Sequence, residues 1–414
     1  MLFKSLYNTA ITAIGLILKL VLLLFLAKNF EVEAVGLYGL ISAAIAISVY
    51  IVGLDYYRFN TRHYIGSSKL KKTKLIHDQL WVHIFSYILF VGIAYVFFTY
   101  DILPEKFYVA FCFLLVAEHL SQELSRILIN ENKQLHANVI TLVRMSGWIP
   151  IFIFCISSEY LQKNIEFLFY LWALGSILSV LLGVFFLRDK LAPPRKLKKM
   201  ALRRIIIGIK IASIFYFSTL VLQFVMYADR FMISGVLGNV ELGVYIFYLS
   251  LANVVQTFVL TGVIFIFYPR LISSVRRRRV GELRDVFFKM LFGALFMAIV
   301  LAGVFLAGID YILDIVNKEE YWNAVDLYKY MLMAVIIQIV VMVLNNYLYA
   351  EHHDKTILTI NVTGLVVLLC SNYLLLNEHG IIGATYSLIF TYSVQLILQV
   401  LVLAFNNKLI LVHG

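Results

Sequence analysis

Two basic residues lie near the middle of long apolar segments. Lys19 lies inside the segment 6–28, and Arg144 lies inside the segment 135–157. A charge at the centre of a membrane helix costs about 2.5–3.5 kcal/mol to insert, so its retention indicates a function. Neither residue has an acidic side chain three or four positions away that could neutralise it within its own helix. The two cations therefore predict a binding site for an anion at membrane depth.

Polar and small residues extend from Lys19 along one face of its segment. They recur at steps of three and four, the repeat of an α-helix, at Asn8, Thr12, Gly15 and Lys19. Such a face does not suit contact with lipid. We therefore predict that Asn8, Thr12 and Lys19 bind a substrate in a polar cavity. The alternative is a structural Lys19 that pairs with a carboxylate on another helix.

Arg144 shares a polar face with Trp148, one turn further along the same segment. The planar guanidinium group suits a bidentate contact with a phosphate group. An indole ring next to it suits stacking on a sugar. We predict that both residues bind substrate. The alternative for Arg144 is an ion pair with Glu118 or Glu123 of the preceding apolar segment.

Three further charged residues are candidates for the same transport chemistry. Glu118 lies deep in its segment, where a carboxylate with a raised pKa can carry a proton or bind Na⁺. Glu123 is a second candidate for ion coupling, although Arg126 three residues later is also a suitable local partner. Lys210 is a candidate substrate ligand, with snorkelling to the membrane surface as the alternative.

The composition explains where these residues must be positioned. Of 414 residues, 62% are hydrophobic and 14% are charged, whereas a soluble domain has about 25% charged residues. A membrane-spanning helix requires roughly 20 apolar residues. We therefore predict an all-α integral membrane protein with twelve transmembrane helices, at about 6–28, 36–59, 76–99, 107–129, 135–157, 166–187, 205–228, 241–267, 287–308, 327–349, 356–376 and 381–405.

The net charge of +11 comes largely from the loops between these segments, which argues against a nucleic-acid partner. Cytoplasmic loops of membrane proteins are enriched in Lys and Arg. The basic loops 188–204 and 270–284 fall on the cytoplasmic side when the N-terminus is placed there. An even number of spans then returns the C-terminus to the same side. The sequence thus predicts a multi-pass protein with both termini in the cytoplasm.

A basic segment and an internal repeat divide the chain in half. The segment 188–204 separates a predicted lobe at 1–187 from a second one at 205–414, each with six spans. The sequence EAVGLY opens the second span and ELGVY opens the eighth, so that Gly36 and Gly243 are 207 residues apart. Two lobes of like orientation would produce this pattern, as they do in transporters built from parallel repeats.

The second predicted lobe carries neutral amides in place of mid-membrane charges. Side chains such as Asn253, Gln256 and Gln338 suit hydrogen bonds to sugar hydroxyls. The alternative is that each amide bridges two neighbouring helices. Asp229 and Arg230 lie at the end of a predicted span, and we interpret them as anchors at the membrane surface.

The sequence lacks the motifs of the common enzyme classes. It contains no recognisable nucleotide-binding, hydrolase or kinase motif. Its histidines and its three cysteines show no metal-ligand spacing. We therefore expect no catalytic residue, no cofactor, no metal site and no enzymatic activity.

Short motifs along the whole chain resemble those of the bacterial polysaccharide flippases. These are the Wzx-type exporters of O-antigen and capsule in the multidrug/oligosaccharidyl-lipid/polysaccharide (MOP) superfamily. The motifs are the G-x-Y openings at Gly36 and Gly243, DRFMIS (229–234), YPRL (268–271) and GIIGA (380–384). The resemblance implies two six-helix bundles around a central cavity.

The resemblance also implies a function. A flippase of this kind moves an undecaprenyl-pyrophosphate-linked oligosaccharide from the cytoplasmic to the periplasmic leaflet of the bacterial inner membrane by alternating access. Lys19 and Arg144 would then line the cavity and meet the pyrophosphate. The expected partners are this lipid-linked oligosaccharide, the bilayer, and the polymerase and chain-length proteins that act in lipopolysaccharide or capsule biosynthesis.

Two other functions remain open. A multidrug exporter of the same superfamily would expel cationic drugs, and its cavity would favour acidic over basic residues. A membrane glycan polymerase or ligase would use the same substrates as a flippase. It would normally carry its active site on a long outer loop, whereas the longest outward loop predicted here is only 308–326.

Overall fold

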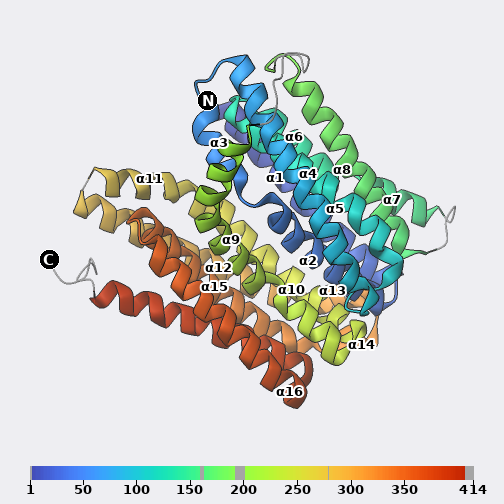
Figure 1. Ribbon diagram of the computed structural model, residues 1–414. Helices are drawn as coiled ribbons and strands as arrows, with labels where there is room; N and C mark the ends of the chain where they lie inside the picture. Colours follow the sequence, from blue (N-terminus) through green and yellow to red (C-terminus); the bar gives the residue numbers. More distant parts are fainter. Residues whose placement is uncertain (1, 159–162, 192–200, 278, 406–414) are drawn as a thin grey trace. The chain divides into compact units, whose positions relative to one another are not determined.

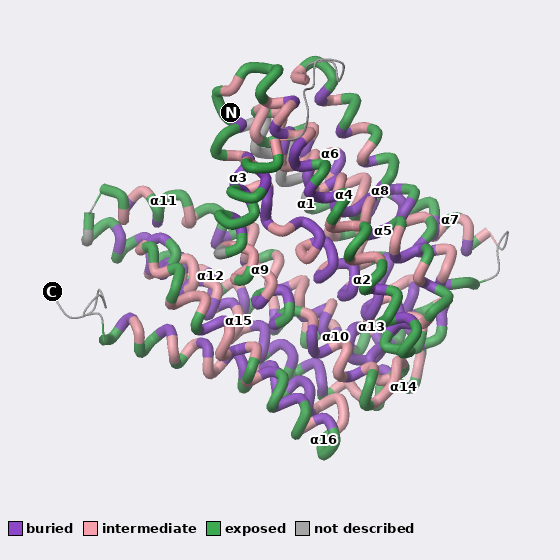
Figure 2. Tube along the Cα trace, viewed as in Figure 1, coloured by how far each residue is buried: buried purple, intermediate pink, exposed green. Residues whose placement is uncertain are grey.

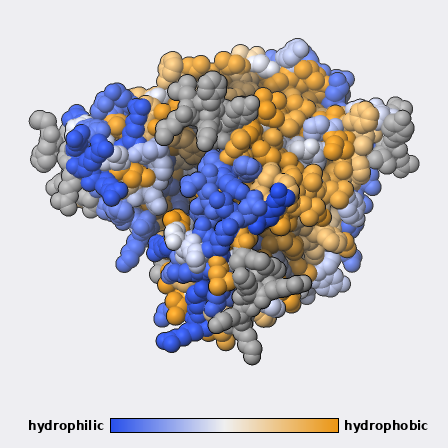
Figure 3. Space-filling view, turned by 90° about the horizontal axis from the view of Figure 1, so that it is seen from above, coloured by the Kyte–Doolittle hydropathy of each residue, from blue (hydrophilic) through white to orange (hydrophobic). Residues whose placement is uncertain are grey.

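The computed structural model describes residues 2–158, 163–191, 201–277 and 279–405. Within these ranges, all the regular elements are helices (Figure 1). Ten of the helices are long and apolar enough to cross a membrane. Hydrophilic residues gather in patches on the face seen in Figure 3, beside broad hydrophobic surfaces. The prediction of an all-α fold of the membrane-spanning kind is confirmed.

The last two predicted spans lie together in one long helix, and the first lies in the N-terminal helix. α16 (Asp354–Phe405) has 52 residues, and its backbone leaves the helical conformation at Gly380, where φ is 58° and ψ is −143°. This region of positive φ favours glycine, and it divides α16 into two arms that match the last two predicted spans. α1 (Leu2–Asn29) contains the first predicted span. Each predicted span therefore overlaps at least one helix, and the predicted span 36–59 runs past the end of the helix Val32–Gly53 into the next helix.

The chain forms two compact units. Unit 1 comprises Met1–Phe25 and Leu40–Gln223, and unit 2 comprises Leu26–Gly39 and Phe224–Gly414. The helices α2 (Val32–Gly53) and α9 (Leu202–Leu237) each contribute to both units. Residues 192–200 of the predicted linker lie outside the described part of the chain. The first half of α9 follows that linker but packs with unit 1.

Contacts with α3 (Tyr56–Tyr64) and α4 (Lys69–Thr99) explain why this part of α9 belongs to unit 1. Arg204 at the start of α9 donates a hydrogen bond to the buried carboxylate of Asp78 on α4. Gly208 lies against Tyr56 and Phe59 of α3, and a Cβ atom at this position would come within 2.7 Å of both rings. The ion pair and the missing side chain therefore fix this end of α9.

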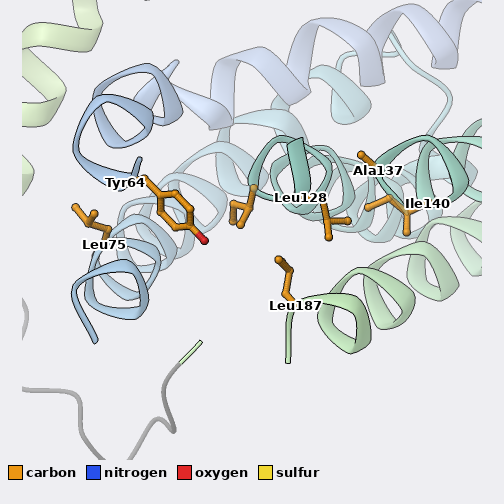
Figure 4. Packing of buried hydrophobic residues seen from close by; sticks show 7 residues of the cluster. Tyr64, Leu75, Leu128, Ala137, Ile140 and Leu187 are labelled. Atoms are coloured by element: carbon orange, nitrogen blue, oxygen red, sulfur yellow. The ribbon is translucent and has the colours of Figure 1, made fainter. Parts of the chain in front are cut away.

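Unit 1 also contains η1 (Glu105–Phe107), α5 (Tyr108–Asn130), α6 (Gln134–Leu142), η2 (Val143–Gly147), α7 (Ile149–Ser157) and α8 (Ile165–Leu187). α5 packs against α6 and α8. Figure 4 shows a cluster of buried side chains that joins five helices of this unit, and its members are Tyr64, Leu75, Ile127, Leu128, Ala137, Ile140 and Leu187. Because lipid is as apolar as these residues, close packing rather than removal from water holds such helices together in a bilayer.

Unit 2 contains α10 (Asn239–Val259), η4 (Leu260–Ile264), α11 (Phe265–Arg276), α12 (Val280–Ala307), α13 (Ile309–Val316), α14 (Glu319–Asn323), α15 (Val325–Ala350) and α16. α15 packs against α10, α12 and α16 and is therefore central to this unit. Figure 2 shows the result: α10 and α15 are largely buried, whereas much of α4 in unit 1 is exposed.

The two repeat motifs meet in unit 2. A Cβ atom on Gly36 of α2 would lie 2.0 Å from the carbonyl oxygen of Asn239, and one on Gly243 of α10 would lie 2.1 Å from that of Val32. Val32 and Asn239 are 207 residues apart, as are Gly36 and Gly243. The same contact is thus made twice, with the two helices exchanging roles. The sequence repeat corresponds to a reciprocal close approach of α2 and α10.

Candidate functional site

Arg144 lies in η2, a π-helical turn between α6 and α7. Pro150 stands in the first turn of α7, and a proline ring has no N–H with which to bond the carbonyl one turn earlier. The missing hydrogen bond loosens the helix at this point, which favours a local change of helical pitch. Single π-turns of this kind are frequent at functional sites. The sequence thus places Arg144 on the irregular part of its span.

The guanidinium group of Arg144 pairs with Glu118 on α5. Its Nη1 atom donates to Glu118 Oε2 at 2.6 Å. The other carboxylate oxygen of Glu118 accepts from Trp172 Nε1 at 2.7 Å and from Ser176 Oγ at 2.8 Å, both on α8. The ion pair with Glu118, weighed above as the alternative role for Arg144, is therefore present. Glu118 is fully hydrogen-bonded in this arrangement.

Lys19 adds a second cation to this pair. Gly15, one turn earlier on α1, faces η2: a Cβ atom there would lie 3.5 Å from Ser146 Oγ. Lys19 itself is partly buried and lies within electrostatic range of both Glu118 and Arg144. Among the described residues, no side chain forms an ion pair or hydrogen bond with its ammonium group.

The site therefore carries more positive than negative charge. One carboxylate, Glu118, faces two cations, Lys19 and Arg144. The Nε atom of Arg144 is buried and finds no hydrogen-bond partner in the described part of the chain. Unfilled donors and a net positive charge in a buried position are suited to an anionic ligand.

Trp148 is packed against α8 in this structure. It is only 4% exposed. Its ring stacks on that of Trp172, with centroids 6.1 Å apart and planes 17° apart. Gly175 of α8 makes room for it, because a Cβ atom there would lie 2.9 Å from the indole ring. In this structure the stacking partner of Trp148 is thus another tryptophan of the same unit, and its contact with a sugar stays a prediction.

The other predicted substrate ligands, Asn8, Thr12 and Lys210, are not seen next to Arg144 in the described structure. Asn8 and Thr12 lie on α1, but their side chains fall outside the described part of the structure. Lys210 lies on α9 with an exposed side chain, as expected for the snorkelling alternative, and forms no ion pair with any described residue. The structure brings Lys210 neither to Arg144 nor to Glu118.

Glu123 belongs to a different polar network of unit 1. Gln79 of α4 donates to its Oε2 atom at 2.5 Å, and Arg126 donates to its Oε1 atom. The local pair with Arg126 is therefore present. Two buried histidines, His83 and His119, lie beside this carboxylate. The sequence offered one signal for this cluster, the spacing of four between His119 and Glu123, but His83 is 36 residues earlier.

An apolar cavity of about 360 Å³ opens elsewhere in unit 1. It is lined by residues of α2, α4 and α9, among them Leu54, Phe85, Leu89, Ile205 and Ile209. Tyr216 closes one side and donates to the Ile51 carbonyl oxygen at 3.3 Å. Its lining suits a hydrocarbon chain.

Unit 2 contains a smaller and more polar pocket. Its volume is about 80 Å³, and Asn253, Gln256 and Gln338 all line it, together with Tyr227 and Tyr392. These are the amides for which the sequence suggested contact with sugar hydroxyls. One of them already has a neighbour, because Gln256 Nε2 lies 3.3 Å from the sulfur of Met342. The amides of α10 and α15 thus converge on one pocket.

Asp229 and Arg230 line this pocket as well, which overturns their interpretation as surface anchors. Asp229 is 2% exposed and accepts a hydrogen bond of 2.5 Å from the hydroxyl of Tyr245. The error came from the predicted end of the span near residue 228. α9 continues to Leu237, so that Asp229 lies more than two turns inside the helix.

No protein-family model matches the sequence, and no curated protein matches it. Solved structures do. A multidrug-resistance MATE family transporter of the MOP superfamily, in an inward-facing conformation, aligns with a TM-score of 0.75 over 98% of both chains, at 10% identity. The lipid II flippase MurJ, in an inward closed conformation, aligns with a TM-score of 0.77 over 96% of this chain and 87% of its own, at 13% identity.

The chain has the fold of these transporters. A third similar structure is a MOP superfamily transporter from Pyrococcus furiosus, for which a reverse polarity of the binding pocket is described. It aligns with a TM-score of 0.61 over 98% of this chain and 94% of its own, at 14% identity. All three similarities extend over nearly the whole chain, so the fold is that of the complete transporter rather than of one lobe.

Proposed function

We propose that this protein is a flippase for a lipid-linked oligosaccharide carried on a pyrophosphate. In the bacterial inner membrane, the substrate would be an undecaprenyl-pyrophosphate-linked repeat unit of O-antigen or capsule, moved from the cytoplasmic to the periplasmic leaflet by alternating access. The observation that carries this proposal is the excess of cations over carboxylates at Lys19, Arg144 and Glu118.

The pyrophosphate group fits the chemistry of this site. It bears negative charge and several acceptor oxygens, and the site has unfilled donors on Lys19 and on Arg144 Nε. Glu118 holds Arg144 in place through Nη1, and no described residue accepts a hydrogen bond from Nε. A membrane potential that is negative inside also drives an anion outward, by about 2.3 kcal/mol per charge for each 100 mV.

The remaining parts of such a substrate find suitable surfaces in the two units. Neutral amides and hydroxyls of the unit 2 pocket, such as Asn253 and Gln338, suit the hydroxyl groups of sugars. The apolar cavity beside Tyr216 in unit 1 suits part of a prenyl chain. The fold similarity to a lipid II flippase supports a lipid-linked substrate, since that protein moves one.

A multidrug exporter with the same fold is the second candidate, because MATE transporters share the architecture. Binding of a cationic drug would require a site with surplus negative charge. Asp229 in the unit 2 pocket provides one carboxylate, but Arg230 lines the same pocket and compensates its charge. The described residues thus favour an anionic cargo over a cationic one.

Transport in a defined system tests the proposal. The purified protein would be reconstituted in liposomes with a fluorescent polyprenyl-pyrophosphate-linked glycan, and transfer between leaflets would be measured for the wild type, Lys19→Ala and Arg144→Ala. Lys289→Ala is the matched control, because Lys289 is an exposed cation paired with Asp285 on α12.

We expect transfer by the wild type and the control variant, and loss of transfer in both site variants. The same variants would be compared for rescue of a flippase-deficient bacterium at equal membrane expression. Export of a cationic dye by the wild type, without transfer of the glycan lipid, would favour the multidrug exporter instead.

A further inference from the structure

Two imidazole groups and one carboxylate meet between α4 and α5, and Arg144 lies within electrostatic range of one of the imidazoles, His119. Ligand atoms of His83, His119 and Glu123 all lie within 4.8 Å of one another, and all three side chains are buried. His119 and Glu123 are one turn apart on α5, and His83 comes from α4. Imidazole nitrogen and carboxylate oxygen are the donors that a divalent transition metal takes from proteins.

The histidines of this cluster lack the hydrogen bonds that buried polar groups normally have. Within the described part of the chain, Nε2 of His119 has no hydrogen-bond partner, and neither ring nitrogen of His83 has one of good geometry, although the Val52 carbonyl group lies close to the His83 ring. His83 is 1% exposed and His119 is fully buried, so bulk water does not satisfy them. Buried nitrogens without partners are rare in folded proteins, and a bound ion is one explanation for them.

The spacing distinguishes a metal from a shared proton. His119 Nε2 lies 3.7 Å from Glu123 Oε1, which is too long for a hydrogen bond. Two ligands of a tetrahedral zinc ion, each about 2.1 Å from the metal, stand roughly 3.4 Å apart. A proton shared between His119 and Glu123 would also not engage His83, whereas a metal ion can engage all three groups.

Neighbouring side chains hold two of the three groups in position for binding. The other ring nitrogen of His119, Nδ1, lies 2.6 Å from the hydroxyl of Tyr87. When Nδ1 carries the proton, Nε2 is left with a lone pair directed into the cluster. Gln79 and Arg126 donate hydrogen bonds to the two oxygens of Glu123 and hold its carboxylate in place. Metal ligands in proteins usually have such supporting hydrogen bonds.

We propose that His83, His119 and Glu123 bind a divalent transition-metal ion, for which Zn²⁺ is the best match. Two histidines and one glutamate leave one position of a tetrahedral zinc ion for water. The ion would join α4 to α5 inside unit 1. Arg126 lies close enough to repel it, and its stacking on Tyr57, with the guanidinium carbon 3.7 Å from the ring centroid, keeps part of that charge against an aromatic face.

Metal content of the purified protein tests this proposal. The full chain in detergent would be stripped with a chelator, dialysed against Zn²⁺ and analysed by elemental mass spectrometry. We expect the wild type to retain about one equivalent more than His83→Gln or His119→Gln. Co²⁺ in place of Zn²⁺ should give the intense visible absorption of a tetrahedral site in the wild type alone.

Two further variants distinguish zinc binding by the buried cluster from nonspecific binding by surface histidines. Tyr87→Phe removes the hydroxyl beside His119 and should weaken zinc binding by about 10- to 100-fold without abolishing it. His379→Gln is the control, because His379 is an exposed histidine that lies 3.9 Å from Glu378. It should retain as much zinc as the wild type.

The thermal unfolding temperature should rise on addition of Zn²⁺ in the wild type and in His379→Gln, but not in His83→Gln. His83 contacts the rings of Tyr87 and His119 and lies near the Val52 carbonyl group, so the unfolding transition of His83→Gln without metal is the check that this variant is folded. Equal zinc content in folded wild type and His83→Gln would overturn the proposal. Folded wild type that retains no zinc after dialysis would overturn it as well.

Discussion

The polar interiors of the two units differ in how they handle charge. In unit 1, Arg144 and Lys19 outnumber Glu118, and guanidinium and ammonium groups are left with unused donors. In unit 2, the buried carboxylate of Asp229 is bonded by the neutral hydroxyl of Tyr245, and Arg230 lines the same pocket. The surroundings of Arg144 therefore suit an anion, whereas the charges in the unit 2 pocket balance each other.

This difference suggests what each half contributes to the proposed substrate. A charged group needs opposite charge at membrane depth, where the low dielectric constant makes the interaction strong. Sugars need many weak, neutral hydrogen bonds, which amides supply. Changes in the two units should therefore have different consequences, and the following variants test this from the largest expected effect to the smallest.

Glu118→Gln should destabilise the protein most, by about 3–5 kcal/mol, because it leaves Arg144 buried beside Lys19 without a carboxylate. Asp229→Asn should cost only about 1 kcal/mol, since the amide oxygen can still accept from Tyr245. Thermal and denaturant unfolding in detergent would measure both. Equal losses would show that the interiors are not electrostatically different.

Gly36→Ala and Gly243→Ala should each cost about 1–3 kcal/mol, because the added methyl group meets a backbone carbonyl. The double variant should cost less than the sum, since both changes separate the same two helices. Gly235→Ala is the control, as no atom lies within 4 Å of its Cβ position. Unequal effects of the first two variants would argue against a shared backbone contact.

Lys19→Met should separate function from stability. Loss of a charge-assisted contact of about 1.5–3 kcal/mol should slow glycan-lipid transfer by roughly 10- to 100-fold. Stability should stay constant or increase, because Lys19 has no ion-pair partner among the described residues. Transfer in liposomes and unfolding in detergent would be measured on the same preparation. Unfolding without loss of transfer would assign Lys19 a structural role.

Gln256→Leu in the unit 2 pocket should have a smaller effect on transport. One neutral hydrogen bond contributes about 0.5–1.5 kcal/mol, so the apparent affinity for the glycan lipid should fall by no more than about tenfold. A substrate analogue that carries the pyrophosphate but no sugar should be unaffected by this variant. Equal sensitivity of both substrates would remove the distinction between the two units.

The ion pair between Lys72 and Glu131 should contribute least. It lies at an end of α5, where Lys72 Nζ donates to Glu131 Oε1 at 2.5 Å. Burial raises the pKa of Glu131, but the hydrogen bond from Lys72, the contact with Tyr64 and the charges of Lys72 and Lys190 together outweigh burial, so the pKa is lowered. A lowered pKa means that stability is present above the unfolded value of about 4.3 and is lost as the pH falls through the folded value.

Unfolding of the wild type and Glu131→Gln should therefore differ by about 1 kcal/mol or less at neutral pH. The difference should vanish as the pH falls below about 4. A difference that persists at low pH would show that Glu131 acts through packing rather than charge.

The sequence was sufficient for the spans, because twenty-residue apolar segments leave few alternatives to helices. It also left two roles for Arg144, a substrate contact or an ion pair with a glutamate of the preceding helix, and the pair with Glu118 is present. The packing of Trp148 could not be predicted from the sequence of its own helix, because Gly175 and Trp172 of α8 determine it.

The same limitation applies to the histidine cluster and to Asp229. His83 and His119 come together only through the packing of α4 against α5, which spacing along the chain does not reveal. Asp229 was predicted to lie at a helix end because the apolar stretch ends near it. The backbone hydrogen bonds of α9 continue to Leu237, so Asp229 lies inside the helix. Contacts between helices thus decide the details that patterns within one helix leave open.

The reciprocal approach of Gly36 and Gly243 has a consequence for the origin of the asymmetry. In a symmetric dimer, two copies of one half-length chain would make this contact twice with a single glycine. Every substitution in such a chain would then appear in both copies. Fusion of the copies frees each from the other, so that one can acquire Lys19 and Arg144 while its counterpart keeps neutral amides.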